Sequence, residues 1–163
     1  MAAEPPNTAH LLAELAKNAA EFNQASDGLN SLIERFEETL RNLHLGIETW
    51  LVRSPLKSDE RKEDYVEDHG AYERGELTVN TQLGFTKRAG EWGLAVRIAV
   101  YRRSGIVEWE FLRVRSEVPL RDASRALRIK ALEKFPELLR SLNEQVKAGI
   151  EKIHAARQFV ELC

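Results

Sequence analysis

The chain has 163 residues, of which 43% are hydrophobic and 31% are charged, and its formal net charge is −2 at pH 7. This length and composition predict one folded domain with its own core and exclude a mostly disordered chain. The single cysteine excludes an intramolecular disulfide and a cysteine-rich metal site, and no run reaches the roughly 20 apolar residues that cross a bilayer. We therefore expect a cytoplasmic protein that does not span a membrane.

The charges are distributed unevenly along the chain. Residues 1–83 carry 8 Lys and Arg against 16 Asp and Glu, whereas residues 97–130 carry 9 Lys and Arg against 4 Asp and Glu. An acidic front half and a basic middle are compatible with charge complementarity within the chain, with association between copies, or with a basic face for an anionic partner.

A long helix is predicted over residues 8–52, because apolar residues recur there with the 3-4 spacing of a helical stripe. Thr8 is expected to cap its start, and Ser54-Pro55 follows its end. The stripe consists of Leu12, Leu15, Ala19, Phe22, Ser26, Leu29, Ile33, Phe36, Leu40, Leu43, Ile47 and Trp50, in which Ser26 is the only polar residue. Such a heptad pattern is typical of coiled coils.

Residues 53–75 are predicted to form an acidic linker or loop, since they combine many charges with almost no apolar periodicity. Residues 76–116 then switch to the period of two that is typical of strands. They predict a three-stranded antiparallel meander, or a four-stranded one if a short strand forms near Tyr65 or Tyr72.

The predicted register of the first two strands follows from a four-residue loop at 87–90. It places Phe85 opposite Trp92 and Leu83 opposite Leu94, so that the apolar side chains share one face. A turn at 103–105 leads into a third strand in which Trp109 continues the inward face. After Phe111 the alternation slips, which indicates a bulge or a strand that leaves the sheet.

The last element is predicted to be a helix over residues 122–162, with Asp122 as its N-cap and a kink near Pro136. Its stripe consists of Leu132, Phe135, Leu139, Leu142, Val146, Gly149, Ile153, Ala156, Val160 and Cys163. The overall prediction is a single α+β domain in which two long helices pack together, antiparallel, on one face of the sheet. Its core should include Phe36, Trp92, Ile98 and Leu139.

The dimensions of these elements predict an oligomer. A strand of about 10 residues spans roughly 33 Å, about half of the roughly 65 Å predicted for the first helix. The sheet therefore leaves part of the helical stripe uncovered. We expect its first residues, Leu12, Leu15, Ala19 and Phe22, to contact another protomer, with a homodimer favoured among the possible oligomers and a different protein as the alternative partner.

No motif names a chemistry: the sequence contains no phosphate-binding glycine loop, no nucleophile elbow and no Glu-x-x-His pair. We therefore predict no catalytic residue, no metal and no cofactor, and our leading hypothesis is a non-catalytic oligomeric interaction or structural module. A second hypothesis is a nucleic-acid-associated protein that uses the basic segment 97–130. A third is an enzyme whose site forms between protomers from the loop at 56–75.

The second hypothesis depends on a group of arginines that could contact phosphates. They are Arg97, Arg102, Arg103, Arg113, Arg115, Arg125 and Arg128. The predicted strand phase places Glu108 and Glu110 across from or diagonal to Arg97, which favours cross-strand ion pairs over a phosphate track.

Overall fold

The structure is a computed structural model that describes residues 8–68, 71–103 and 109–161, and within these all side chains except those of residues 60–68, 71–76, Arg103 and Glu161. Two long helices, α1 (Thr8–Asn42) and α2 (Arg125–Glu161), lie at the two ends of the chain. Between them are β1 (Thr49–Trp50), β2 (Lys57–Asp68), β3 (Ala71–Arg88), β4 (Glu91–Arg103), β5 (Glu110–Pro119) and the 3₁₀ helix η1 (Leu120–Asp122). The predicted α+β class is confirmed, with more strands than expected.

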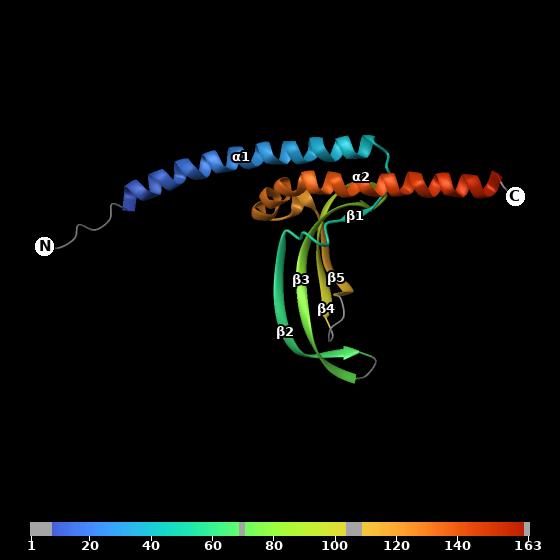
Figure 1. Cartoon of the computed structure of the whole chain (residues 1–163). Coiled ribbons are helices and arrows are strands. Elements are labelled where there is room, and N and C mark those ends of the chain that lie inside the picture. Colours follow the sequence, from blue (N-terminus) through green and yellow to red (C-terminus); the bar gives the residue numbers. More distant parts are fainter. Residues whose placement is uncertain (1–7, 69–70, 104–108, 162–163) are drawn as a thin grey trace.

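The described strands form one antiparallel sheet in the order β1-β3-β4-β5, and β2 pairs with β3 as well. Figure 1 shows that the two helices lie across one end of this sheet, while the β2–β3 hairpin projects away from them. The core therefore forms at the helical end of the sheet, where Leu83, Phe85, Leu94 and Val96 meet both helices.

Helix α1 ends at Asn42, ten residues before the predicted end. The backbone turns left-handed at His44 and Gly46, with φ angles of 49° and 64°, and Leu43 and His44 donate their N–H groups to carbonyls three residues back. A glycine with positive φ is a common helix terminator. The heptad residues Ile47 and Trp50 therefore lie outside the helix, and Trp50 belongs to β1.

The prediction of a linker or loop at 53–75 was wrong, because β2 occupies residues 57–68 and β3 begins at Ala71. The β2 residues from Lys57 to Glu63 pair with β3 residues from Thr81 to Gly75, and the register shifts before Val66. A strand at a sheet edge is held by backbone hydrogen bonds and tolerates charged side chains. Because β2 consists mostly of charged residues, it shows no apolar alternation from which a strand could be predicted.

The β3–β4 register differs from the predicted one by two residues. Ala89 and Gly90 form a two-residue turn in which both φ angles are positive, 47° and 91°, as type I′ hairpin turns require. Phe85 consequently pairs with Leu94, and Leu83 with Val96. A shift of two keeps every side chain on its predicted face.

The irregularity predicted after Phe111 is confirmed. The β4–β5 register shifts between Ile98 and Ala99 and between Val100 and Tyr101, so Leu112 and Arg115 are the extra residues of two bulges. The prediction that Trp109 faces inward was wrong, since Trp109 and Phe111 are 40% and 49% exposed. Most of the predicted turn at 103–105 lies outside the described residues.

Helix α2 begins three residues later than predicted, at Arg125. The hydroxyl of Ser124, rather than a side chain of Asp122, accepts a hydrogen bond from the N–H of Leu127 at 3.4 Å, while Asp122 belongs to η1. The helix remains continuous across Pro136. In Figure 1 its first turns point in a different direction from its long remainder, in keeping with the predicted bend.

Burial corrects the phase of the α2 stripe by one residue in its first half. Ala131, Phe135, Leu138 and Leu142 are buried, whereas Leu139 is 42% exposed. The other predicted core residues, Phe36, Trp92 and Ile98, are partly buried and pack against the core clusters. The predicted positions Phe135 and Leu142 are thus correct, and Leu138 replaces Leu139.

The two helices run parallel, which corrects the predicted antiparallel hairpin. Phe22 of α1 lies beside Arg125 of α2, and Phe36 stacks on Phe135 with ring centroids 4.1 Å apart, so residue numbers rise in the same direction along both helices. The four longer strands alternate in direction and return the chain to the helical end of the sheet (Figure 1). This topology sets the direction of α2.

Candidate functional site

The two parallel helices are offset along their axes, so one end of each helix does not pack against the other helix. The contacts between α1 and α2 extend from Phe22 with Arg125 to Phe36 with Phe135, and α1 ends at Asn42. Residues 8–21, here called the α1 extension, project beyond the start of α2, and residues 143–161, the α2 extension, project beyond the end of α1 (Figure 1). At 1.5 Å per residue they are about 21 Å and about 28 Å long.

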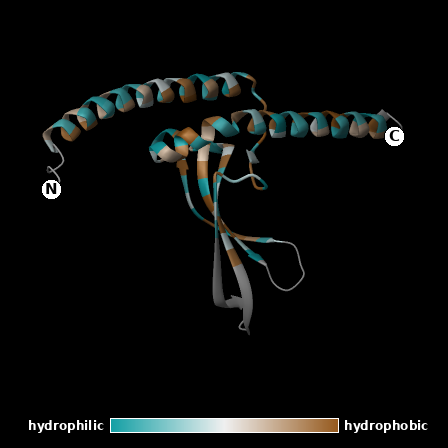
Figure 2. Cartoon of the chain, turned by 60° about the vertical axis from the view of Figure 1, so that its left-hand side comes forward, coloured by the Kyte–Doolittle hydropathy of each residue, from teal (hydrophilic) through white to brown (hydrophobic). Residues whose placement is uncertain are grey.

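Both extensions expose large apolar side chains. Leu12 and Leu15 are 60% and 63% exposed in the α1 extension, and Phe159 and Val160 are each 71% exposed in the α2 extension. Figure 2 shows hydrophobic residues that recur along both helices into their projecting parts. Leu11, Phe22, Ile150 and Ile153 are also about half exposed. Uncovered apolar surface on this scale is typical of an interaction site.

The residues predicted to form an oligomer interface lie together on this uncovered surface. Leu12, Leu15 and Ala19 are exposed in the α1 extension, and Phe22 is 51% exposed where the extension meets α2. The α2 extension lies outside the predicted interface, although the same 3-4 apolar spacing continues along it. Its members are Val146, Gly149, Ile153, Ala156 and Val160.

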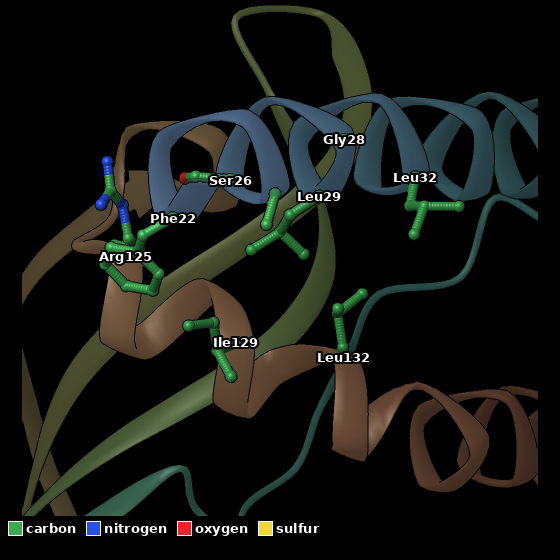
Figure 3. A pocket seen from close by; sticks show the side chains of 9 residues that line it. Phe22, Ser26, Gly28, Leu29, Leu32, Arg125, Ile129 and Leu132 are labelled. Carbon is green, nitrogen blue, oxygen red and sulfur yellow. The ribbon is translucent and has the colours of Figure 1, made fainter. Parts of the chain in front are cut away.

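An apolar pocket lies between the helices at the base of the α1 extension (Figure 3). Phe22, Leu29 and Leu32 of α1 face Ile129 and Leu132 of α2 around a space of about 420 Å³. A second, shallower hollow continues along the same seam to Phe36 and Phe135. The pocket extends the exposed apolar surface of α1 onto the start of α2.

Arg125 borders this pocket. Its guanidinium lies 4.4 Å from the ring centroid of Phe22 and donates a hydrogen bond to the side-chain oxygen of Asn23 at 3.0 Å. Arg128, one turn later, donates to the side-chain oxygen of Asn30. Both arginines therefore join α2 to α1, instead of extending a basic surface from the sheet.

The remaining arginines of the predicted anion-binding group do not converge on one face. Arg102 forms an ion pair with Glu110 at 2.9 Å, and Arg113 and Arg115 are exposed on β5. Because neighbouring strand residues alternate between faces, Arg97 and Arg102 point to opposite faces of β4. The side chain of Arg103 lies outside the described residues.

Arg97 belongs to a polar and aromatic cluster on the sheet face that points away from the main core. It lies 4.2 Å from the ring centroid of Trp50 and donates from Nε to the side-chain oxygen of Gln82 at 2.8 Å. The fully buried Gln82 in turn donates to the hydroxyl of Tyr101 at 2.7 Å. Arg97 on β4 pairs with Glu117 on β5, whereas Glu110 pairs with Arg102. The predicted pairing of Arg97 with Glu110 was therefore wrong. Glu108, the other predicted partner, lies outside the described residues.

Glu48 closes the other side of this cluster. The hydrogen bond from Thr86 is the largest cause that lowers the pKa of Glu48; partial burial opposes it, and the Trp50 indole N–H and the charge of Arg97 reinforce it. Sequence reasoning missed Glu48 and Trp50 because it placed both in the first helix. Both residues lie outside α1 because the chain leaves the helix at the positive φ angles of His44 and Gly46.

A separate polar group, formed by Ser54, Lys134 and Glu137, joins α2 to the segment before β2. Lys134 contacts Ser54 and Glu137, and the Ser54 hydroxyl donates to Glu137 at 2.9 Å. The hydrogen bond from Lys134 is the main cause that lowers the pKa of Glu137, against a smaller opposing effect of burial. Each of these three side chains contacts the other two, so the group links α2 to the segment before β2.

Within residues 8–68, 71–103 and 109–161, no three His, Cys, Asp or Glu side chains are grouped closely enough to hold a metal ion. Over the same residues, neither helix combines the length and the apolar character that crossing a bilayer requires. The segment 56–75, on which the enzyme hypothesis depended, is mostly strand and not a loop.

Comparison with known proteins finds no family model, no curated protein and no solved structure that matches the chain. Candidate functions must therefore be argued from the surfaces described above, chiefly the apolar faces of the two helix extensions and the apolar pocket between α1 and α2.

Proposed function

We propose that this protein is a non-catalytic interaction module that associates with copies of itself through the apolar faces of its long helices. One observation carries the proposal: the stripe that is buried where α1 and α2 overlap continues, uncovered, along both extensions. Leaving this apolar surface in water is unfavourable, and a partner that packs on the extensions would bury it.

The exposed side chains are numerous enough to support association. Burying a Leu, Ile, Val or Phe side chain completely stabilises by about 1.5–3 kcal/mol, and eight such residues in or beside the extensions are about half exposed or more: Leu11, Leu12, Leu15, Phe22, Ile150, Ile153, Phe159 and Val160. Covering their exposed parts would contribute on the order of 10 kcal/mol per copy, and hence roughly 20 kcal/mol per dimer. This exceeds the cost of association, about 4–15 kcal/mol. A dimer is the smallest assembly that provides this cover.

The proposed compartment is the cytoplasm. The chain has one cysteine and hence no intramolecular disulfide, and a domain without disulfides is compatible with a reducing compartment.

The test is the oligomeric state of the wild-type protein and of charge-substituted variants, measured by light scattering across the micromolar range. We expect the wild type to self-associate and the double variant Leu12→Glu with Leu15→Glu to weaken the association about 100-fold, since two half-exposed leucines are lost from the interface. The matched control is Ala13→Glu with Ala20→Glu, which places the same charges on the opposite face of α1.

A wild-type protein that remains monomeric over this range would refute the proposal. Equal weakening by the control pair would show that charge, rather than the apolar stripe, governs association, and would also overturn it. Circular dichroism of each variant verifies that α1 remains helical.

A further inference from the structure

We infer that two copies exchange their extensions, so that the α1 extension of each copy packs along the α2 extension of the other. This inference depends on the self-association proposed above and specifies which surfaces meet. Alternative pairings, α1 extension with α1 extension or α2 extension with α2 extension, are outcomes of the test.

Continuity of the apolar stripes supports the exchange. In the α1 extension, Leu12, Leu15 and Ala19 continue the heptad series whose later members, Leu29 and Ile33, are buried against α2 and the sheet. In the α2 extension, Val146, Gly149, Ile153, Ala156 and Val160 continue the series of Phe135 and Leu142. Where α1 and α2 overlap, each helix covers the stripe of the other. The α1 extension therefore lacks an α2 helix beside it and the α2 extension lacks an α1 helix, and a second copy provides both.

The side chains of the two stripes differ in size in a complementary way. The α1 extension presents Leu12 and Leu15, whereas the α2 extension includes Gly149 and Ala156. A Cβ added at Gly149 would meet nothing within 4 Å, so the stripe has open space at this position. Bulky side chains of one helix can enter such gaps in the other and bring the two helices close together.

The charges near the stripes favour the mixed pairing. On a helical projection, Lys152 and Arg157 border the α2 stripe, whereas Glu144 and Glu151 lie on the opposite side of the helix. The α1 extension carries Glu14 and Glu21 against a single Lys17, and hence a net charge of −1. Pairing two α2 extensions would bring four bordering positive charges together, whereas the exchange places them against a helix of net negative charge.

The length of the contacts is sufficient for a stable dimer. The shorter extension has 14 residues, so two reciprocal contacts cover about 42 Å of helix. Within one chain, α1 packs on α2 and the sheet over residues 22–42, about 31 Å. The exchange therefore offers more helix–helix contact than the protein already uses to hold α1 in place.

The first experiment is cross-linking between copies. In a Cys163→Ser background, one preparation carries Leu15→Cys and a second carries Ile153→Cys; the two are mixed, allowed to exchange subunits and treated with a short bis-maleimide. We expect the mixed cross-link to form in higher yield than either symmetric one. The control Ala13→Cys, on the opposite face of α1, should give little mixed product.

A second experiment measures a charge rescue. Lys152→Glu with Arg157→Glu should weaken self-association about fivefold to tenfold at low salt, and mixing this variant with Glu14→Lys plus Glu21→Lys should restore it. The control is to mix the variant Lys152→Glu with Arg157→Glu with the wild type. A symmetric pairing of two α2 extensions would be restored by the wild type, whose Lys152 and Arg157 would meet the substituted carboxylates. The exchange is fully restored only by the variant with the substituted α1 extension.

The outcomes separate the two proposals. A protein that dimerises but yields only symmetric cross-links, or shows no charge rescue, overturns the exchange and leaves self-association intact. A monomeric protein overturns both. A mixed cross-link together with charge rescue supports the exchange.

Discussion

The two halves of α1 have the same heptad pattern and different surroundings. Between Phe22 and Asn42 the stripe packs on α2 and the sheet, and Ile33 and Leu40 are at most 1% exposed. Between Thr8 and Glu21 the same spacing leaves Leu12 and Leu15 about 60% exposed. The difference arises because α2 begins only at the level of Phe22. An apolar stripe therefore indicates that a helix face requires cover, and does not indicate what covers it.

The largest expected effect contrasts these halves directly. Ile33→Ala removes a fully buried side chain and should lower the free energy of unfolding by about 2–5 kcal/mol through lost burial and a residual cavity. Leu12→Ala, measured at concentrations where the monomer predominates, should cost less than about 1 kcal/mol. Urea unfolding monitored by circular dichroism tests both. Comparable losses would mean that the α1 extension is covered within a single chain.

The same contrast occurs between neighbours in α2. Leu138 is fully buried and Leu139 is 42% exposed, so Leu138→Ala should cost about 2–5 kcal/mol and Leu139→Ala clearly less. Denaturant titration of the two variants under identical conditions provides the measurement. The opposite order would restore the heptad phase predicted from the sequence and refute the observed one.

A smaller effect is expected at glycines beneath covering side chains. A Cβ at Gly84 would overlap the Trp50 ring and approach the Thr49 carbonyl oxygen to 2.7 Å, whereas at Gly93 the obstacle is the end of the Glu37 side chain. Gly84→Ala should therefore destabilise by about 1–3 kcal/mol, and Gly93→Ala by less, because Glu37 can move aside. Thermal unfolding distinguishes them, and a harmless Gly84→Ala would show that Trp50 does not cover β3.

A still smaller effect concerns pH. The pKa of Glu48 is lowered below its ordinary value of 4.5, chiefly by the hydrogen bond from Thr86, so the ionised carboxylate stabilises the fold at neutral pH. Protonation removes this contribution as the pH falls through the lowered pKa. Because Glu48 is exposed, Glu48→Gln should cost under about 1 kcal/mol at pH 7. The difference in free energy of unfolding between Glu48→Gln and the wild type should vanish in acid. A difference that grows as the pH falls would contradict the lowered pKa of Glu48.

No effect is expected from the exposed arginines of β5. The arginines of segment 97–130 are divided between two sheet faces and the α1–α2 contact, so polyanion affinity should be weak near ~150 mM salt and unchanged by Arg113→Ala with Arg115→Ala. Fluorescence anisotropy with labelled single-stranded DNA measures it. Tight binding that persists at this salt concentration and disappears in the double variant would instead favour the nucleic-acid hypothesis.

The sequence by itself determined the features that depend on neighbouring residues. The heptad spacing predicted two long helices, and the period of two from Leu77 to Val100 predicted β3 and β4 with the correct faces, because side-chain periodicity reports local backbone geometry and burial. The bulge after Phe111 was predicted for the same reason. The uncovered face of Leu12 and Leu15 followed from the relative lengths of helix and strand.

Only the tertiary structure decided the features that depend on distant partners. The strand β2 exists because its backbone pairs with β3, whatever its charged side chains suggest. The β3–β4 register differs by two residues because both registers bury the same faces, and only the Ala89-Gly90 turn distinguishes them. The parallel direction of α2, and with it the separation of the two extensions, follows from the path of the chain through the sheet, which no local pattern encodes.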